Sequence, residues 1–455
     1  MSYLKSYRNN RTFLHTAGTY MHAESIYLCH VKNVIRIMKR LLILILWAGF
    51  AGKVFAQLSL DICLKKAQAN YPLVRQYELI SMTENYDLSN AAKGNLPQVA
   101  MSGKASYQSD VTTIPLNIPG YTIESLPKDQ YQIMVEVNQN IWDGGQIYHN
   151  KQKVKAVSDE NRRQADVSMY ALNERVNQIF FGILLIDEQL RQNNLLETDL
   201  TRNLKNVTAY RENGLANNAD VDAVNVEILN TRQKRLELEN NRLAYVRMLS
   251  LLIGEEIKSD TEFMKPVAEE NLATEIRRPE LALYAAQEHR LDVASQALKA
   301  GYMPRFSIFL QGAYGNPGLN MLKNEFEPYY MVGARLNWNF GTLYTLKNDR
   351  KKLEAERRQV YMNRDLFLLN TRVNLSEQEA AIKTLRKQME TDDEIIRMRT
   401  NIRCSAEAKV ANGTLTVTEM LRELTNESLA RQNKAFHEIS LLMEIYKHKQ
   451  LTNAY

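Results

Sequence analysis

Side chains capable of acid–base, nucleophilic or metal chemistry are scattered through this sequence and form no catalytic group. Beyond residue 56 the histidines stand far apart, at His149, His289, His437 and His448. The sequence contains no Gly-rich phosphate loop, and its histidines and cysteines lack the spacing of a metal site. The sequence therefore indicates a protein that is not an enzyme and that needs no cofactor and no metal.

Cysteine use is equally sparse. Cys63 and Cys404 are the cysteines beyond residue 56, and they lie far apart in the sequence. Two cysteines can pair in an oxidising compartment, but they do not make the dense framework of a disulfide-stabilised domain.

The N-terminal segment has the pattern of an export signal. A basic start at Met38 opens an apolar run from Leu41 to Ala51, and a small-residue site precedes Gln57. An apolar stretch of about 11 residues is typical of a secretory signal peptide, here residues 38–56, whereas a membrane anchor needs about 20. We therefore expect an exported protein.

The excess of basic over acidic residues lies in this N-terminal segment. Residues 1–37 are mixed and aperiodic, so we interpret them as an extension upstream of a start codon at Met38 and exclude them from the fold. The first 56 residues carry eight Lys or Arg against Glu24, so the net charge of +6 falls to about −1 for the remainder. A nucleic-acid partner requires a clustered basic face on the folded protein, and we expect none.

The remaining sequence repeats itself at an offset of about 200 residues. A proline followed by a strand ending in tyrosine occurs in residues 91–107 and again in 298–314. Further on, an Asn-Gly pair occurs at Asn213 and at Asn412. Because repeats set architecture, we expect two copies of one unit. The expected boundaries are 57–256 for the first repeat, 257–278 for an equatorial linker and 279–455 for the second repeat.

Four segments alternate between apolar and polar side chains, which predicts strands with one apolar face. In the second of them, Tyr131 and Ile133 fall on one side and Gln132 and Glu136 on the other. Phe309 interrupts the polar side of the third. The expected strands are about 97–113, 129–142, 304–314 and 329–341.

Such strands fit two environments. Runs of about ten alternating residues with aromatic ends match transmembrane barrel strands, and a half-buried sheet of a soluble domain alternates in the same way. Export, and two hairpins with long loops rich in Pro and Gly, favour the barrel. Because four strands do not close a barrel and hydrocarbon does not tolerate an open sheet edge, several chains must complete it. A dimer, trimer or tetramer satisfies the minimum of about eight strands.

Two very long helices are expected. From Gln146 to about Arg211 there is no proline and one glycine, Gly182, so one helix there spans ~100 Å at ~1.5 Å per residue. Apolar side chains within it repeat at alternating steps of four and three, which predicts coiled-coil packing. The members of this seam are Leu172, Val176, Ile179, Ile183, Ile186 and Leu190. Each Asn-Gly pair ends a long helix, and a return helix completes hairpins over about 146–254 and 343–452.

Three short motifs, in this order within a duplicated chain, resemble TolC-type outer-membrane factors. The opening Leu58 to Ala67 with Asn70-Tyr71-Pro72 is similar to the first segment of that family, and Trp142-Asp143-Gly144-Gly145 resembles the element leaving its second strand. Gly214-Leu215 with Asp220-Val221 resembles its hairpin tip. The resemblance covers essentially all of residues 57–455.

The resemblance implies a TolC-like fold that is mainly α with a transmembrane β-barrel contribution. Four strands per chain would complete a 12-stranded barrel in a homotrimer embedded in the outer-membrane lipid of a Gram-negative cell, and the helical hairpins would form a periplasmic α-barrel. It also implies a passive exit duct for small molecules or proteins in a tripartite efflux or secretion system. Its expected partners are a periplasmic adaptor (membrane fusion) protein and an inner-membrane RND or ABC transporter. The alternative is an exported periplasmic coiled-coil scaffold or adaptor protein without channel activity.

The same resemblance assigns roles at the hairpin tips. In the best-known members, acidic side chains near the second tip narrow the pore and favour cations. Glu419 matches one such position, whereas Arg422 occupies the other. With Asp220, which lies at the parallel position of the first tip, Glu419 is a candidate for a pore constriction. A first-turn acid is also favoured by the helix dipole at any helix start. The expected adaptor-facing residues are Asn213, Gly214, Leu215, Asn412, Gly413, Thr414 and Leu415.

Overall fold

The computed structural model describes residues 57–112, 126–267, 272–321 and 323–453. The expected upstream extension and signal peptide, residues 1–56, lie outside the described residues. Contacts divide the chain into two compact units. In the described part of the smaller one, residues 57–58 and 260–262, the Leu58 N–H donates to the Glu262 carbonyl at 3.0 Å. The larger unit holds all the helices and strands of the described residues.

A four-stranded antiparallel sheet with the strand order β1-β2-β3-β4 forms as the alternating segments predict. The central pair, β2 and β3, joins the two halves of the chain, with a register shift between Asn140 and Trp142. The strands are β1 Gln98–Tyr107, β2 Asp129–Trp142, β3 Arg305–Asn316 and β4 Glu327–Asn337. β1 and β4 are shorter than expected.

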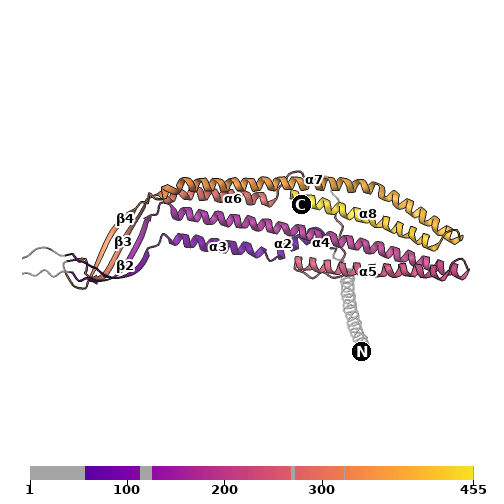
Figure 1. The fold of residues 1–455 in the computed structure, drawn as a ribbon, viewed down its shortest axis with the longest axis horizontal. Coiled ribbons are helices and arrows are strands. Elements are labelled where there is room, and N and C mark those ends of the chain that lie inside the picture. Colours follow the sequence, from indigo (N-terminus) through magenta and orange to yellow (C-terminus); the bar gives the residue numbers. More distant parts are fainter. Residues whose placement is uncertain (1–56, 113–125, 268–271, 322, 454–455) are drawn as a thin grey trace, which may run out of the picture. The chain divides into compact units, whose positions relative to one another are not determined.

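Two antiparallel helical hairpins make up more than half of the described residues (Figure 1). One consists of α4, Gln146–Glu212, and α5, Asn218–Ile253. The other consists of α7, Thr342–Ala411, and α8, Val417–Thr452. Every member of the predicted heptad seam on α4 is buried except Leu190, which is half-buried. The predicted long helices and their coiled-coil seam are therefore confirmed.

Shorter helices pack beside the hairpins. α3, Val74–Lys93, packs on α4, and α6, Pro279–Ala297, packs on both α4 and α7. α2, Leu60–Asn70, contacts α4 and α5, and the 3-10 helix η1, Leu298–Tyr302, leads into β3. No helix of the described residues is both long and apolar enough to cross a membrane.

Each long helix begins at a short side-chain turn directly after a strand. After β2, the Asp143 carboxylate accepts hydrogen bonds from the backbone N–H groups of Gly145 at 2.8 Å and Ile147 at 2.6 Å. After β4, the Asn339 side chain accepts one from the Gly341 N–H at 2.9 Å. This turn ends β4 at Asn337 although the alternation in the sequence continues beyond it.

Candidate functional site

The histidines, the side chains most suited to acid–base or metal chemistry, lie on three different helices. His149 is on α4, His289 on α6, and His437 and His448 on α8. In the part of the chain that the structure describes, no three His, Cys, Asp or Glu side chains lie together as a metal site would require. Cys63 and Cys404 are both free thiols, the first buried and the second exposed.

The sheet exposes its apolar face. Val99, Met101 and Val332 leave 69, 74 and 62% of their surfaces exposed, whereas polar side chains on the opposite face of β2 and β3, such as Gln132 and Gln311, are half-buried. No helix of the described residues packs across either face. In a soluble sheet the apolar face is the covered one, so this arrangement is inverted. The same apolar face also carries Tyr131, Ile133, Val135, Phe306, Ile308, Leu310, Tyr314, Tyr330 and Leu336.

The polar face is internally hydrogen-bonded. Gln311 Nε2 donates to Glu136 Oε2 at 2.8 Å, and Arg335 Nη1 lies 3.4 Å from the other carboxylate oxygen. Phe309, which breaks the polar alternation, lies opposite Gly333 in the β3–β4 register. A Cβ on Gly333 would lie 2.6 Å from the Phe309 ring. The missing side chain of Gly333 therefore makes room for this ring.

The first hairpin tip has the turn that its Asn-Gly pair predicts. Gly214 has φ = +74°, a left-handed conformation that glycine adopts without strain. Asn213 caps α4, and the Leu215 N–H donates to the Tyr210 carbonyl at 2.8 Å. The Leu215 side chain is 56% exposed.

The second tip repeats this turn. Gly413 has φ = +69°, Asn412 caps α7, and the Thr414 N–H donates to the Lys409 carbonyl at 2.9 Å. Leu415 differs from Leu215, because it is half-buried and packs against a core shared by both hairpins. The members of this shared tip core are Leu200, Val207, Val224, Ile228, Ala406, Val410, Val417, Met420, Leu421 and Leu424.

The two candidate constriction acids occupy equivalent positions in the two tips. Asp220 closes a capping box with Asn217 at the start of α5, and Glu419 closes one with Thr416 at the start of α8. Hydrogen bonds from the Thr416 hydroxyl and backbone N–H lower the pKa of Glu419 below its usual value. Both carboxylates therefore stabilise the start of a helix, which is a structural role separate from that of a pore constriction.

A network of buried charge lies next to the shared tip core, and the sequence did not reveal it. Glu427 on α8 is only 5% exposed and accepts hydrogen bonds from Thr400 at 2.8 Å, Arg431 at 2.6 Å, and Arg403. Burial raises the pKa of Glu427, but these hydrogen bonds outweigh it, and the pKa lies below its ordinary value.

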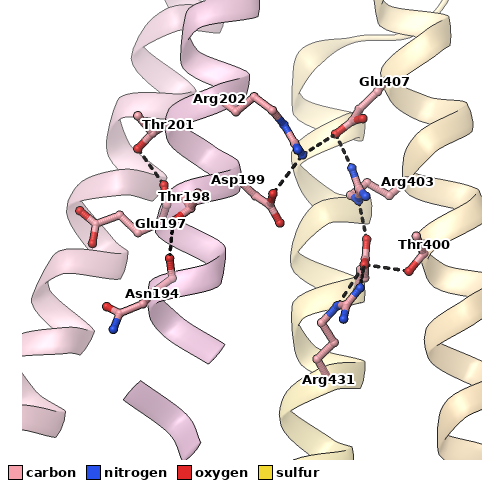
Figure 2. Close-up of polar contacts among 11 residues, drawn as sticks. Asn194, Glu197, Thr198, Asp199, Thr201, Arg202, Thr400, Arg403, Glu407 and Arg431 are labelled. Carbon is pink, nitrogen blue, oxygen red and sulfur yellow. Dashed lines mark hydrogen bonds and ion pairs between the residues drawn. The ribbon is translucent and has the colours of Figure 1, made fainter. Parts of the chain in front are cut away.

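This network reaches the other hairpin. Arg403 Nη1 lies 2.6 Å from Glu407 Oε1, and the same oxygen lies 3.8 Å from Arg202 Nη2 on α4. Figure 2 shows Arg202 between Asp199 of its own helix and Glu407 of α7. Polar contacts therefore connect the two hairpins beside the apolar core that they share.

Comparison with known proteins gives a family match for part of the chain and a set of similar solved structures. Residues 63–255 match the family model described as outer membrane efflux protein. No curated protein has a matching sequence. Three solved structures are similar over most of the chain. The outer-membrane channel OprN has 12% identity and a TM-score of 0.65, covering 87% of this chain and 90% of its own. The outer membrane channel CmeC of Campylobacter jejuni has 12% identity and a TM-score of 0.63, and the match covers 86% of this chain and 85% of CmeC. The outer membrane protein VceC of Vibrio cholerae has 9% identity and a TM-score of 0.62, and the match covers 86% of this chain and 95% of VceC.

These identities are low, so the structural likeness establishes the fold, which is mainly helical with a four-stranded antiparallel sheet, as in TolC-like factors. The family match over residues 63–255, together with the shared fold, confirms the resemblance to the TolC family. Proteins of this family are passive channels rather than enzymes.

Proposed function

We propose that the chain is the outer-membrane channel component of a tripartite efflux or secretion system. It acts as a passive exit duct for small molecules or proteins, driven by an inner-membrane RND or ABC transporter through a periplasmic adaptor. Residues 57–256 and 279–455 act as two repeats around the linker 257–278, with the sheet in the outer membrane and the hairpins in the periplasm. The observation that carries this proposal is the exposed apolar face of the sheet.

Lipid is the environment that this face fits. Contiguous apolar patches on soluble monomers are small, and larger ones mark contacts with protein or membrane. Here the apolar side chains run along all four strands while the polar face is the partly sheltered one. Barrel strands place apolar side chains toward lipid and polar ones toward a lumen. A periplasmic scaffold without channel activity would leave this whole face in water.

The free edges of the sheet support a homotrimer. β1 and β4 each pair on one side within the chain, and unpaired backbone groups are costly in hydrocarbon. Pairing of β4 with β1 of the next copy satisfies both edges, and three copies complete the 12-stranded barrel.

Exposed apolar seams on the hairpins support the same assembly. On α7 the exposed apolar side chains recur at heptad steps, and a second set recurs on α5. Because their own hairpin does not cover them, a neighbouring copy is the proposed partner. The α7 set is Met362, Leu366, Leu369 and Val373, and the α5 set is Val226, Leu229, Leu236 and Leu243.

The hairpin tips are the proposed adaptor-facing region. α4 is 67 residues long, which places the first tip ~100 Å from the end of β2. That distance suits a partner in the periplasm rather than in the outer membrane. Asp220 and Glu419, at the first turns of the return helices, are the proposed constriction residues.

Cysteine accessibility tests the membrane face directly. Met101 and Ser102 are neighbours on opposite faces of β1, and both are exposed in the single chain. In a Cys404→Ser background, we expect a water-soluble maleimide to label Ser102→Cys in intact outer membranes and to leave Met101→Cys unlabelled until the membranes are dissolved. Equal labelling of both positions would contradict a lipid-facing sheet.

A further inference from the structure

The acidic side chains on the polar face of the sheet are neutralised within the chain. Glu136 accepts a hydrogen bond from Gln311 and is paired with Arg335. Glu327, at the other end of the same face, is paired with Lys323, with Nζ and Oε1 2.8 Å apart. Neither carboxylate therefore contributes a full negative charge to the space in front of this face.

Two basic side chains on the same face have no acidic partner among the described residues. Lys104 is exposed and lies opposite the neutral Gln132 in the β1–β2 register. Arg305, at the start of β3, donates to the neutral amide oxygen of Gln146. Both positions keep their positive charge uncompensated.

Arg335 is held in place on this face. Its guanidinium lies over the Phe309 ring, 4.9 Å from the ring centroid, while it reaches Glu136 two strands away. The Arg335 side chain is 46% exposed whereas that of Glu136 is 20% exposed. The cation of the pair is therefore presented outward, and the carboxylate lies behind it.

We propose that this face makes the lumen of the barrel favour anions, with Lys104, Arg305 and Arg335 as the specificity-determining residues and small anionic solutes as the substrate class. This inference rests on the proposed function, because the face borders a water-filled lumen only in a closed barrel. Rings of Lys or Arg side chains select anions. Every copy in the assembly repeats these charges, which act over about 8–10 Å at physiological salt.

Ion selectivity in planar lipid bilayers tests the inference. The reversal potential of the purified assembly in a KCl gradient gives the chloride-to-potassium permeability ratio. In an Asp220→Asn, Glu419→Gln background, which removes the charges of the proposed constriction, we expect the channel to prefer chloride, and Lys104→Gln and Arg335→Gln each to lower that ratio about twofold or more. Arg335→Gln has the larger effect because it also uncovers Glu136. Ser102→Asn, a neutral change on the same face, is the matched control and leaves the ratio unchanged.

The outcomes separate this inference from the proposed function. A cation-selective channel in this Asp220→Asn, Glu419→Gln background, or Lys104→Gln and Arg335→Gln ratios equal to that of Ser102→Asn, would overturn the anion preference while leaving the channel intact. Absence of any conductance from a correctly assembled oligomer would contradict the channel itself, and the lumen assignment with it.

Discussion

Thr416 and Glu419 cap helix α8 reciprocally. The Thr416 hydroxyl oxygen accepts a hydrogen bond from the Glu419 N–H at 3.2 Å, and the Glu419 carboxylate accepts one from the Thr416 N–H at 3.1 Å. Asn217 and Asp220 make the same exchange at the start of α5, at 3.0 and 2.9 Å. The acids that family resemblance assigns to a pore constriction therefore also hold the geometry of the two tips.

Loss of the cap weakens the second tip. We expect Thr416→Ala to lower the free energy of unfolding by about 1 kcal/mol, because the Glu419 N–H loses its side-chain acceptor. Thr416→Ser keeps the hydroxyl and serves as the control. Denaturant titration followed by helical circular dichroism measures the difference, and equal stability of the Ala and Ser variants would refute the capping role.

The charge of Glu419 is separable from its capping role. Gln also closes a capping box, so Glu419→Gln is expected to keep the helix start at neutral pH while removing the proposed constriction charge. Since the folded-state pKa of Glu419 is lowered, its contribution to stability is present above the unfolded-state pKa of about 4.3 and is lost as the pH falls through the folded-state pKa. Any difference in unfolding free energy between the unmodified protein and Glu419→Gln should therefore shrink in acid. At neutral pH the conductance of the two channels should differ.

Glu427 is the anchor of the charged network beside the tip core. Glu427→Ala leaves the guanidiniums of Arg403 and Arg431 without their shared acceptor, and we expect a loss of about 3 kcal/mol in unfolding free energy. Glu237→Ala is the control, because Glu237 is 57% exposed and paired with Lys234, and such pairs contribute less than about 1 kcal/mol. Similar losses in the two variants would show that the burial of Glu427 is unimportant.

His448 should make the folded protein sensitive to mild acid. It is 1% exposed, and its ring nitrogens have no hydrogen-bond partner among the described residues. Burial lowers its pKa, opposed by Glu379, whose Oε1 lies 3.8 Å from Nε2. The unfolded chain then takes up a proton near pH 6.5 that the folded chain resists, so stability falls as the pH drops below about 6.5.

Replacement of His448 should remove this pH dependence. We expect His448→Met to flatten the fall in unfolding free energy between about pH 7 and pH 5. The exposed His289 provides the control variant, His289→Gln, which should behave like the unmodified protein. An unchanged slope in His448→Met would assign the acid sensitivity to other groups.

The absence of a side chain at Gly182 allows α4 and α5 to pack closely. A Cβ at this position would lie 2.4 Å from Tyr245 Cε1, so Gly182→Leu should destabilise the first hairpin, by about 1–3 kcal/mol if the site behaves as an overpacked core. Tyr245→Ala in the same chain should recover part of the loss, because it vacates the clashing ring. Additive losses in the double variant would mean that the two residues do not interact.

The sequence predicted the features that local rules determine. Period-two alternation located the four strands, and the heptad seam and Asn-Gly pairs located the long hairpins, because each signal lies within a few turns of chain. The end of β4 was missed because Trp338 continues the alternation, while the Asn339 side chain turns the backbone into α7.

Tertiary features were not predictable in this way. Glu427 on α8 and the exposed Glu237 on α5 look alike in the sequence, and the packing of α8 against α7 is what buries Glu427. Phe309 stood out as a break in the polar alternation, but its partner Gly333 lies on the next strand, across the register. Gly182 stood out in the sequence as the one glycine of a long helix, but the sequence did not show that the Tyr245 ring packs against it.

Membrane fractionation of the expressed mature chain, followed by electrophoresis in mild detergent with and without boiling, tests whether the protein is a trimeric outer-membrane channel. A trimeric channel should give a species in the outer-membrane fraction that needs detergent for extraction, runs near three times the protomer mass and collapses to the protomer on boiling. A detergent-independent monomer or dimer in the soluble fraction would contradict the trimeric channel and favour the coiled-coil scaffold.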